Sequence, residues 1–260
     1  MKDLNNRIVL LTGAGGGFGK EFIRHFSQEG CQLILSDLKK EMVEANLKDF
    51  TAAKVLGIIE SDLSNDKGVN DLYEQVIKTS KTVDVLVNNA GIASFGNFYE
   101  LPMENWQRIM QINTMALMQL THLCLPQMIK NHRGHIVNIS SIAGHVPAPG
   151  LSVYNTSKFA VRGFSLALSQ EVQKHNIQVT AVYPFFAKTN ILDSQRFGDR
   201  KEMELPDFLV DSPEKVIDEV MHAVKSDQLE VFPSLYAKTT ATMQRFAPWA
   251  GELLNKMVMK

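Results

Sequence analysis

The chain of 260 residues has little cysteine, no long apolar run and no excess of either charge. Cys31 and Cys124 alone cannot make a disulfide framework, and each lies in an apolar stretch that is typical of a buried thiol. This favours a reducing, intracellular setting. The apolar run before Thr12 is too short for a signal peptide, and no run of about 18 apolar residues could span a membrane. We therefore expect a soluble, cytoplasmic protein.

The charge balance excludes one class of partner. Lys and Arg number 27 and Asp and Glu number 28, so the formal net charge is -1. Without bulk positive charge, no nucleic acid partner is expected, and affinity for anionic lipid would need a local patch. The 45% hydrophobic and 21% charged residues are typical of a globular protein and exclude a disordered or low-complexity chain.

Short apolar runs alternate with helical patterns along the chain. Such alternation predicts parallel strands with helices on both faces, which is a single doubly wound, Rossmann-like α/β domain with a mostly parallel sheet. We assign this domain to residues 1–232 and a C-terminal helical extension to residues 233–260. Long helical stretches cover roughly residues 101–129 and 153–174, and the expected strands are residues 8–11, 32–36, 55–59, 83–87, 135–139 and 178–183.

A glycine-rich turn, Thr12-Gly13-Ala14-Gly15-Gly16-Gly17-Phe18-Gly19, separates the first strand from the first helix. Glycines let the backbone approach a pyrophosphate closely, and the helix that follows presents free N–H groups to it. Asp37 ends the second strand, where a carboxylate accepts hydrogen bonds from ribose hydroxyls and repels a 2′-phosphate. The pattern favours NAD(H) and disfavours NADP(H). Two alternatives stay open: Asp37 as a helix cap, and Lys39 or Lys40 reaching a phosphate.

Tyr154 and Lys158 share one face of a helix, four residues apart. A neighbouring ammonium favours the phenolate and lowers the pKa of a tyrosine, which then exchanges a proton with an alcohol or a carbonyl. Ser141 closes the fifth strand, so its side chain and the residues that end the fourth strand should converge at one sheet edge. The alternative for the pair alone is a buried tyrosine beside a surface lysine.

Together these motifs resemble the short-chain dehydrogenase/reductase family, in order and spacing, from residue 7 to about residue 190. The matching residues are Thr12-Gly13-xxx-Gly17-x-Gly19, Asp62-Leu63, Asn88-Asn89-Ala90-Gly91, Asn113, Ser141, Tyr154-xxx-Lys158, and Pro184 with Thr189.

The resemblance implies four catalytic residues. Tyr154 is the expected general acid and base, and Lys158 lowers its pKa and binds the nicotinamide ribose. Ser141 holds the substrate oxygen, with Ser140 as the alternative. Asn113 holds a water that links Lys158 to solvent, unless its amide only bonds local backbone.

The resemblance also implies a cofactor site. Asp62 and Leu63 would contact adenine, the residues Asn89, Ala90 and Gly91 would follow the adenosine and ribose, and Thr189 would hold the carboxamide. The full set adds Tyr154 and Lys158 to Gly13, Gly17, Phe18, Gly19, Asp37, Pro184 and Ala187. The family has Pro-Gly where this chain has Pro184-Phe185, so the contact through Ala187 and Thr189 is expected to shift. No metal site is assigned.

The substrate is expected to be a lipophilic alcohol or ketone of steroid, retinoid or fatty type. Phe185 and Phe186 would line its pocket with Ser141 and Tyr154, and residues 185–211 would form an aromatic-rich lid. His145 and Ser94 are weaker candidates for the pocket wall. The resemblance further implies a homodimer or homotetramer. The alternative function is a catalytically silent nucleotide-binding scaffold that acts through protein partners; related chemistries are epimerisation and acyl-chain keto reduction.

The tail after Pro233 has an apolar stripe flanked by basic residues. Such a helix can lie on a membrane, cover a neighbouring subunit or pack on its own domain. The stripe comprises Met243, Phe246, Trp249, Ala250, Leu253, Leu254 and Met257, and the basic residues are Lys238, Arg245, Lys256 and Lys260.

Overall fold

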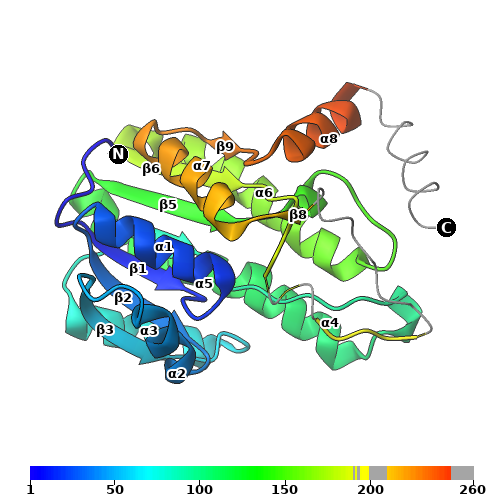
Figure 1. Cartoon of the computed structure of the whole chain (residues 1–260), viewed down its shortest axis with the longest axis horizontal. Helices are drawn as coiled ribbons and strands as arrows, with labels where there is room; N and C mark the ends of the chain where they lie inside the picture. The colour runs from blue at the N-terminus through cyan, green and yellow to red at the C-terminus, as the bar shows by residue number, and fades with distance from the viewer. Residues whose placement is uncertain (190, 192–193, 199–209, 247–260) are drawn as a thin grey trace.

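The computed structural model describes residues 1–189, 191, 194–198 and 210–246. Its centre is a sheet of seven parallel strands in the order β3-β2-β1-β4-β5-β6-β9 (Figure 1). The strands are β1 (Ile8–Thr12), β2 (Gln32–Asp37), β3 (Lys54–Glu60), β4 (Val85–Asn88), β5 (Gly134–Ile139), β6 (Ile177–Val182) and β9 (Glu230–Val231). The predicted doubly wound α/β fold is confirmed.

Helices cover both faces of the sheet, because successive residues of a strand point to opposite sides. In β1, Leu11 packs in the core with α1 and α7, whereas Leu10 packs in the core with α3 and α5. One face carries α1 (Gly17–Gln28), α2 (Lys40–Leu47) and α7 (Pro213–Lys225), and the other carries α3 (Asp66–Thr79), α5 (Ala116–Lys130) and α6 (Ser152–Val172). This double cover explains why the strands are apolar throughout.

The sequence did not predict three two-residue strands. β9 extends the sheet beside β6, and β7 (Phe186–Ala187) pairs with β8 (Val210–Asp211). Two residues carry no recognisable alternation, so only the tertiary contact reveals such strands. The strand order reverses between β1 and β4, where the ends of neighbouring strands leave a crevice.

The predicted helix over residues 101–129 is divided. It consists of α4 (Met103–Met110), the π-helical turn η2 (Gln111–Met115) and α5. A π turn inserts one residue into the helical repeat, and such turns are frequent at functional sites. Here η2 carries Asn113.

The last described element is α8 (Leu235–Phe246), which projects beyond the rest of the fold in Figure 1. Residues 247–260 of the predicted extension, including Trp249 and Leu253, lie outside the described residues. Within the described ranges, the helices are all too short or too polar to cross a membrane. Short 3₁₀ turns lie at η1 (Phe98–Glu100), η3 (Ile142–Gly144) and η4 (Gln173–His175).

Candidate active site

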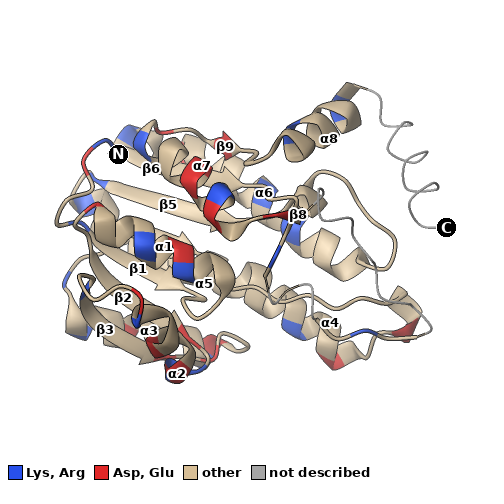
Figure 2. Cartoon of the chain, viewed as in Figure 1, with Lys and Arg blue, Asp and Glu red and all other residues tan. Residues whose placement is uncertain are grey.

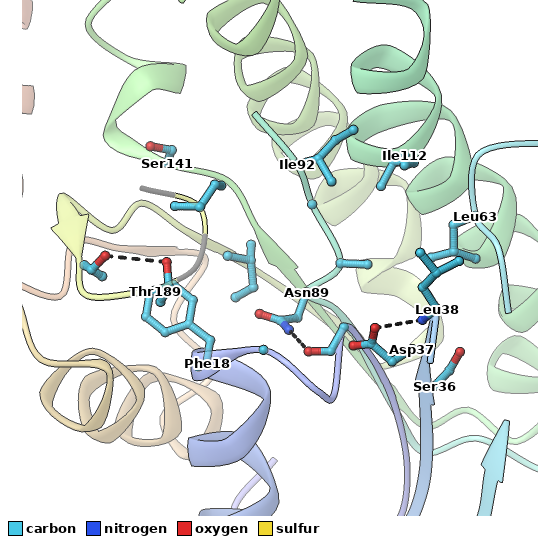
Figure 3. A pocket seen from close by; sticks show the side chains of 18 of the residues that line it. Phe18, Ser36, Asp37, Leu38, Leu63, Asn89, Ile92, Ile112, Ser141 and Thr189 are labelled. Carbon is cyan, nitrogen blue, oxygen red and sulfur yellow. Dashed lines mark hydrogen bonds between the residues drawn. The ribbon is translucent and has the colours of Figure 1, made fainter. Parts of the chain in front are cut away.

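A pocket of about 390 Å³ lies at the carboxyl ends of the strands. Figure 3 shows Asp37 at one end and Ser141 at the other. The pocket brings together most of the site residues that were predicted from the sequence. These are Gly13, Gly17, Phe18, Asp37, Asp62, Leu63, Asn89, Ala90, Gly91, Ser141, Tyr154, Lys158, Pro184, Phe185, Ala187 and Thr189.

Three predicted site residues do not line the pocket. Gly19 is buried where α1 meets the glycine turn, and a Cβ there would lie 2.4 Å from the carbonyl oxygen of Gly13. Phe186 packs edge-on against Phe185, which does line the pocket; their ring centroids are 5.1 Å apart and the angle between the ring planes is 83°. Asn113 is 1% exposed and lies below the pocket floor. The two weaker candidates, His145 and Ser94, also lie outside the lining.

The glycine turn is shaped for close approach of a phosphate. Gly13 has a φ of +66°, and a Cβ there would lie 2.9 Å from the Cα of Ala90. The first turn of α1 has no acidic residue, and its N-cap, Gly16, has no side chain to bind the free N–H groups. These features fit the pyrophosphate of a dinucleotide.

The turn is held in place by the loop that follows β4. The Asn89 Nδ2 donates to the carbonyl oxygens of Thr12 at 3.0 Å and Gly13 at 2.9 Å. The Thr12 hydroxyl accepts from the backbone N–H groups of Asn89 and Ala90, each at 3.1 Å. The Asn89 side chain therefore fixes the turn, in addition to lining the pocket.

Asp37 stands at the other end of the pocket, where β2 ends. Its Oδ2 accepts from the Gly15 N–H at 2.8 Å, and its Oδ1 accepts from the Leu38 N–H at 2.7 Å. The alternative of Asp37 as a helix cap is wrong, because α2 begins at Lys40 and Lys39 is its N-cap. Lys39 also lines the pocket, so its alternative role toward a phosphate stays open.

Asp62 lies on the wall near this end, after β3. Its Oδ1 accepts from the Ser64 N–H at 2.9 Å, and this bond is the main reason why the pKa of Asp62 is lowered. The Arg108 guanidinium lowers that pKa further and lines the same pocket. Asp62 is therefore a fixed anionic acceptor near the Asp37 end of the pocket.

Tyr154 and Lys158 lie side by side at the Ser141 end. The Lys158 Nζ donates to the Ile139 carbonyl oxygen at 2.8 Å and lies 5.6 Å from the centroid of the Tyr154 ring. Burial lowers the pKa of Lys158 to about 8. Burial also raises the pKa of Tyr154. A hydrogen bond to Ser141 lowers this pKa by less than burial raises it, and the resulting value is about 12. The net shift of the Tyr154 pKa is therefore upward, and the lowering that the sequence leads us to expect from Lys158 stays a prediction.

The two serines after β5 have different environments. The Ser140 hydroxyl donates to the Lys158 carbonyl oxygen at 2.9 Å, so it joins β5 to α6. The Ser141 oxygen accepts from the Ala143 N–H at 3.2 Å and reaches the Tyr154 hydroxyl. Of the two, Ser141 is the hydroxyl placed to share a substrate oxygen with Tyr154.

Asn113 joins three segments beneath the pocket. Its Nδ2 donates to the Ile92 carbonyl oxygen at 2.9 Å and to the Ser157 hydroxyl at 3.0 Å, and its Oδ1 accepts from the Ile92 N–H at 2.9 Å. The alternative of purely local bonding is wrong, because these partners lie on the loop after β4 and on α6. One lone pair of Oδ1 is left, so the water relay to Lys158 stays a prediction.

Several lining residues escaped the sequence reasoning. Most of these residues lie next to a strand end or a predicted site residue in the sequence. That proximity is the one feature of the sequence that could have indicated them. Arg108 and Ile112 come from the helix pair around η2, which only the tertiary fold brings to the pocket. The full set is Ser36, Leu38, Met42, Ser61, Ile92, Arg108, Ile112 and Ile139.

The family model for short chain dehydrogenases matches residues 7–199. A putative oxidoreductase, SadH, from Mycobacterium tuberculosis is 32% identical over an alignment of 257 residues, with 94% of this chain and 92% of that protein covered. The estradiol 17-beta-dehydrogenase 11 of Homo sapiens is 31% identical over 257 residues, with 95% and 81% covered.

Solved structures agree with this assignment. A short chain dehydrogenase/reductase from Burkholderia phymatum in complex with NAD has a TM-score of 0.84 at 22% identity, with 96% of each chain covered. A short-chain dehydrogenase from Sphingobium yanoikuyae in complex with NADPH has a TM-score of 0.81 at 26% identity, with 96% of this chain and 94% of that chain covered. The chain belongs to the short-chain dehydrogenase/reductase family, whose members are NAD(P)-dependent oxidoreductases that act on CH–OH groups.

Proposed function

We propose that this protein transfers a hydride between NAD(H) and a lipophilic secondary alcohol or ketone. One observation carries the proposal: a single pocket has a glycine turn and Asp37 at one end and Ser141, Tyr154 and Lys158 at the other. This spacing gives one extended ligand a phosphate cradle and a proton-transfer group.

A nicotinamide held in this pocket beside Lys158 and Thr189 would supply or accept the hydride. Tyr154 exchanges the proton at its phenolic oxygen, and Ser141 donates a hydrogen bond to the substrate oxygen on which charge develops. Lys158 is held by the Ile139 carbonyl oxygen, so its ammonium stays beside the phenol and favours the phenolate. Asn113 fixes η2 against the Ile92 loop and leaves one acceptor position for a water near Lys158.

The preference for NAD(H) rests on the Asp37 carboxylate. Its Oδ2 is fixed by the Gly15 N–H, at the end of the pocket that would hold the adenosine ribose. A 2′-phosphate brought to that carboxylate would add about two negative charges next to it. Relatives of this fold bind NAD in one case and NADPH in another, so the preference is a property to be measured on this chain.

The lipophilic substrate class is supported by the pocket wall. Phe185 and Ile191 line the pocket near Tyr154, and the Phe185 ring is itself backed by Phe186. One relative is an estradiol dehydrogenase and another a CLA biosynthesis dehydrogenase/reductase, which are consistent with steroid and fatty substrates. Within the predicted lid over residues 185–211, residues 190, 192–193 and 199–209 lie outside the described residues.

We also propose a homodimer in the cytoplasm, formed through the helices η2, α5 and α6. Met115, Met118 and Phe159 are large apolar side chains exposed on these helices. Exposed apolar side chains gathered on neighbouring helices mark an interaction site, and most soluble oligomers are assemblies of identical chains with twofold symmetry. Light scattering of the purified protein would give its mass, and a Met118→Glu/Phe159→Glu variant should then be monomeric.

The experiment that tests the proposed function is a cofactor and substrate screen. The purified protein is mixed with NAD or NADP and a panel of secondary alcohols, and absorbance of the reduced nicotinamide is followed. We expect turnover with NAD and a lipophilic alcohol, and none with the Tyr154→Phe variant. Binding of NAD without turnover of any alcohol or ketone would favour the scaffold function instead.

A further inference from the structure

The C-terminal helix α8 presents its apolar face to solvent. Leu235 and Phe246 are 72% and 78% exposed, and Tyr236 and Met243 are 40% and 41% exposed. The residue of α8 that is buried against the body is Ala237. An ordinary surface helix buries its large apolar side chains. In α8 the small side chain of Ala237 is buried instead, and the large apolar side chains are exposed.

The exposed side chains share one face. At 100° per residue, positions 235, 236, 243 and 246 fall within about one third of the helix circumference. Thr239 lies in the middle of that face and is also exposed. We call these five residues the outer face of α8.

Positive charge flanks the outer face. Lys238 and Arg245 are exposed along one edge of it, and the helix has no Asp or Glu between residues 235 and 246 (Figure 2). A helix with apolar side chains on one face and cations beside them is suited to the boundary between anionic headgroups and acyl chains. The chain as a whole has a net charge of -1, so this local concentration departs from the general surface.

The outer face lies next to the substrate end of the pocket. The ring of Tyr236 lies 6.2 Å from the ring of Phe185, which lines the pocket. α8 also contacts η3, the turn that begins at Ser141. A surface that covered α8 would therefore be close to the place where the substrate oxygen is held.

We propose that the outer face of α8 binds an anionic lipid membrane, from which the lipophilic substrate enters the pocket past Phe185. This proposal rests on the proposed function for the substrate class, but membrane binding can be measured without turnover. A second copy of the chain is a poorer occupant, because pairing two α8 helices antiparallel about a twofold axis would bring their Lys238 and Arg245 cations to the same edge of the pair.

Vesicle sedimentation of the full-length protein tests the proposal. We expect the protein to pellet with phosphatidylcholine vesicles that contain phosphatidylserine and to bind pure phosphatidylcholine vesicles far less. Lys238→Glu/Arg245→Glu should weaken binding to the anionic vesicles by about tenfold or more. Leu235→Ser/Phe246→Ser should abolish it, because the apolar insertion is lost.

A second exposed apolar patch gives a matched control. Tyr99 and Met103 are 84% and 64% exposed, but Glu100 and Glu104 lie beside them. Tyr99→Ser/Met103→Ser should bind anionic vesicles as the unmodified protein does. All variants should oxidise a water-soluble alcohol equally, whereas the two α8 variants should lose turnover of a lipophilic alcohol dissolved in the vesicles.

Three results would overturn the proposal. The protein could stay in the supernatant with both kinds of vesicle, or the Lys238→Glu/Arg245→Glu variant could bind as well as the unmodified protein. A lower mass of Leu235→Ser/Phe246→Ser by light scattering without vesicles would show instead that a second copy covers the outer face. Failure of turnover with the soluble alcohol would count against the proposed function and leave the vesicle result unaffected.

Discussion

His145 Nε2 lies 3.8 Å from the Oε1 of Glu230, and the Nε of Arg162 lies 3.9 Å from the same oxygen. The Tyr183 hydroxyl lies close to Glu230 and Arg162. Burial is the main cause of the raised pKa of Tyr183; Glu230 raises this pKa further, and Arg162 lowers it. The atoms His145 Nε2, Arg162 Nε and Tyr183 Oη are buried without a direct hydrogen-bond partner. Separations of this size suit a bridging water, so Glu230 is the acceptor for a small buried cluster.

This cluster joins the elements that carry the catalytic candidates. His145 ends the turn that Ser141 begins, and Arg162 lies one helical turn after Lys158. We predict that Glu230→Gln lowers the free energy of unfolding by about 1 kcal/mol, because it leaves Arg162 without its counter-charge. It should also lower kcat several-fold at unchanged KM for NAD, since η3 loses a support. Chemical denaturation and steady-state kinetics measure the two effects.

Asp218→Asn is the control for Glu230→Gln. Asp218 pairs with His25 and Arg24 between α7 and α1, and none of the three lines the pocket. Its removal should leave kcat unchanged. Equal kinetics for Glu230→Gln and Asp218→Asn would show that the cluster only supports the fold.

Two buried histidines predict acid destabilisation. Burial lowers the pKa of His135 to about 3 and that of His145 to about 4, both from an ordinary value of 6.5. Because the unfolded chain binds these protons first, stability is full above pH 6.5 and falls as pH decreases toward 4. Each histidine should contribute a slope of about 1.4 kcal/mol per pH unit in this window.

Urea unfolding at a series of pH values tests this slope. In the His145→Asn variant the slope between pH 6.5 and 4 should be smaller than in the unmodified protein, because one of the two buried imidazoles has been removed. An unchanged slope for His145→Asn would mean that this ring already carries a proton in the fold.

The sequence predicted the sheet, its flanking helices and most of the pocket lining, for a physical reason. Strand periodicity, glycine turns and strand-end residues are local patterns, and parallel strands bring their carboxyl ends to one edge. β9, Arg108 and the Asp37–Gly15 hydrogen bond depend on contacts between distant segments and leave no local pattern. Spacing along the helix predicts that Tyr154 lies near Lys158, but it says nothing of the burial that raises the pKa of Tyr154.

The pH dependence of alcohol oxidation should report the Tyr154–Lys158 pair. In the chain itself the pKa of Tyr154 is about 12 and that of Lys158 is about 8, so the oxidation rate should rise with pH as the phenolate becomes populated. Bound oxidised nicotinamide adds positive charge and moves the profile to lower pH. Lys158→Met removes the ammonium, so kcat/KM should fall by about 10²-fold or more and the profile should shift to higher pH.

Lys174→Met, on the turn after α6, is the matched control for Lys158→Met. Lys174 lies in η4, outside the pocket lining. Its profile should match that of the unmodified protein. A Lys158→Met variant with the same profile would show that Tyr154 does not depend on this cation.

Asp37→Asn should shift cofactor preference toward NADP. The substitution keeps an oxygen for the Gly15 N–H and removes the negative charge. We expect the ratio of kcat/KM for NAD over NADP to fall by about tenfold or more, because the repulsion of a 2′-phosphate is lost. Glu60→Gln is the control, since Glu60 ends the adjacent strand and accepts from Lys40 but does not line the pocket. Equal ratios for the two variants would count against Asp37 as the selecting residue.

Substitution by alanine should change the stability of the protein in opposite directions at two helical glycines, Gly19 and Gly163. A Cβ at Gly19 would lie 2.4 Å from the Gly13 carbonyl oxygen and 2.6 Å from that of Ala14, whereas a Cβ at Gly163 in α6 would meet nothing within 4 Å. Gly163→Ala should therefore stabilise the protein by about 0.5–1 kcal/mol through helix propensity alone. Gly19→Ala should push the glycine turn away from α1, lowering both the melting temperature and the affinity for NAD. Calorimetric unfolding and NAD titration measure these effects, and a Gly19→Ala protein that binds NAD normally would show that the turn need not pack so closely on its helix.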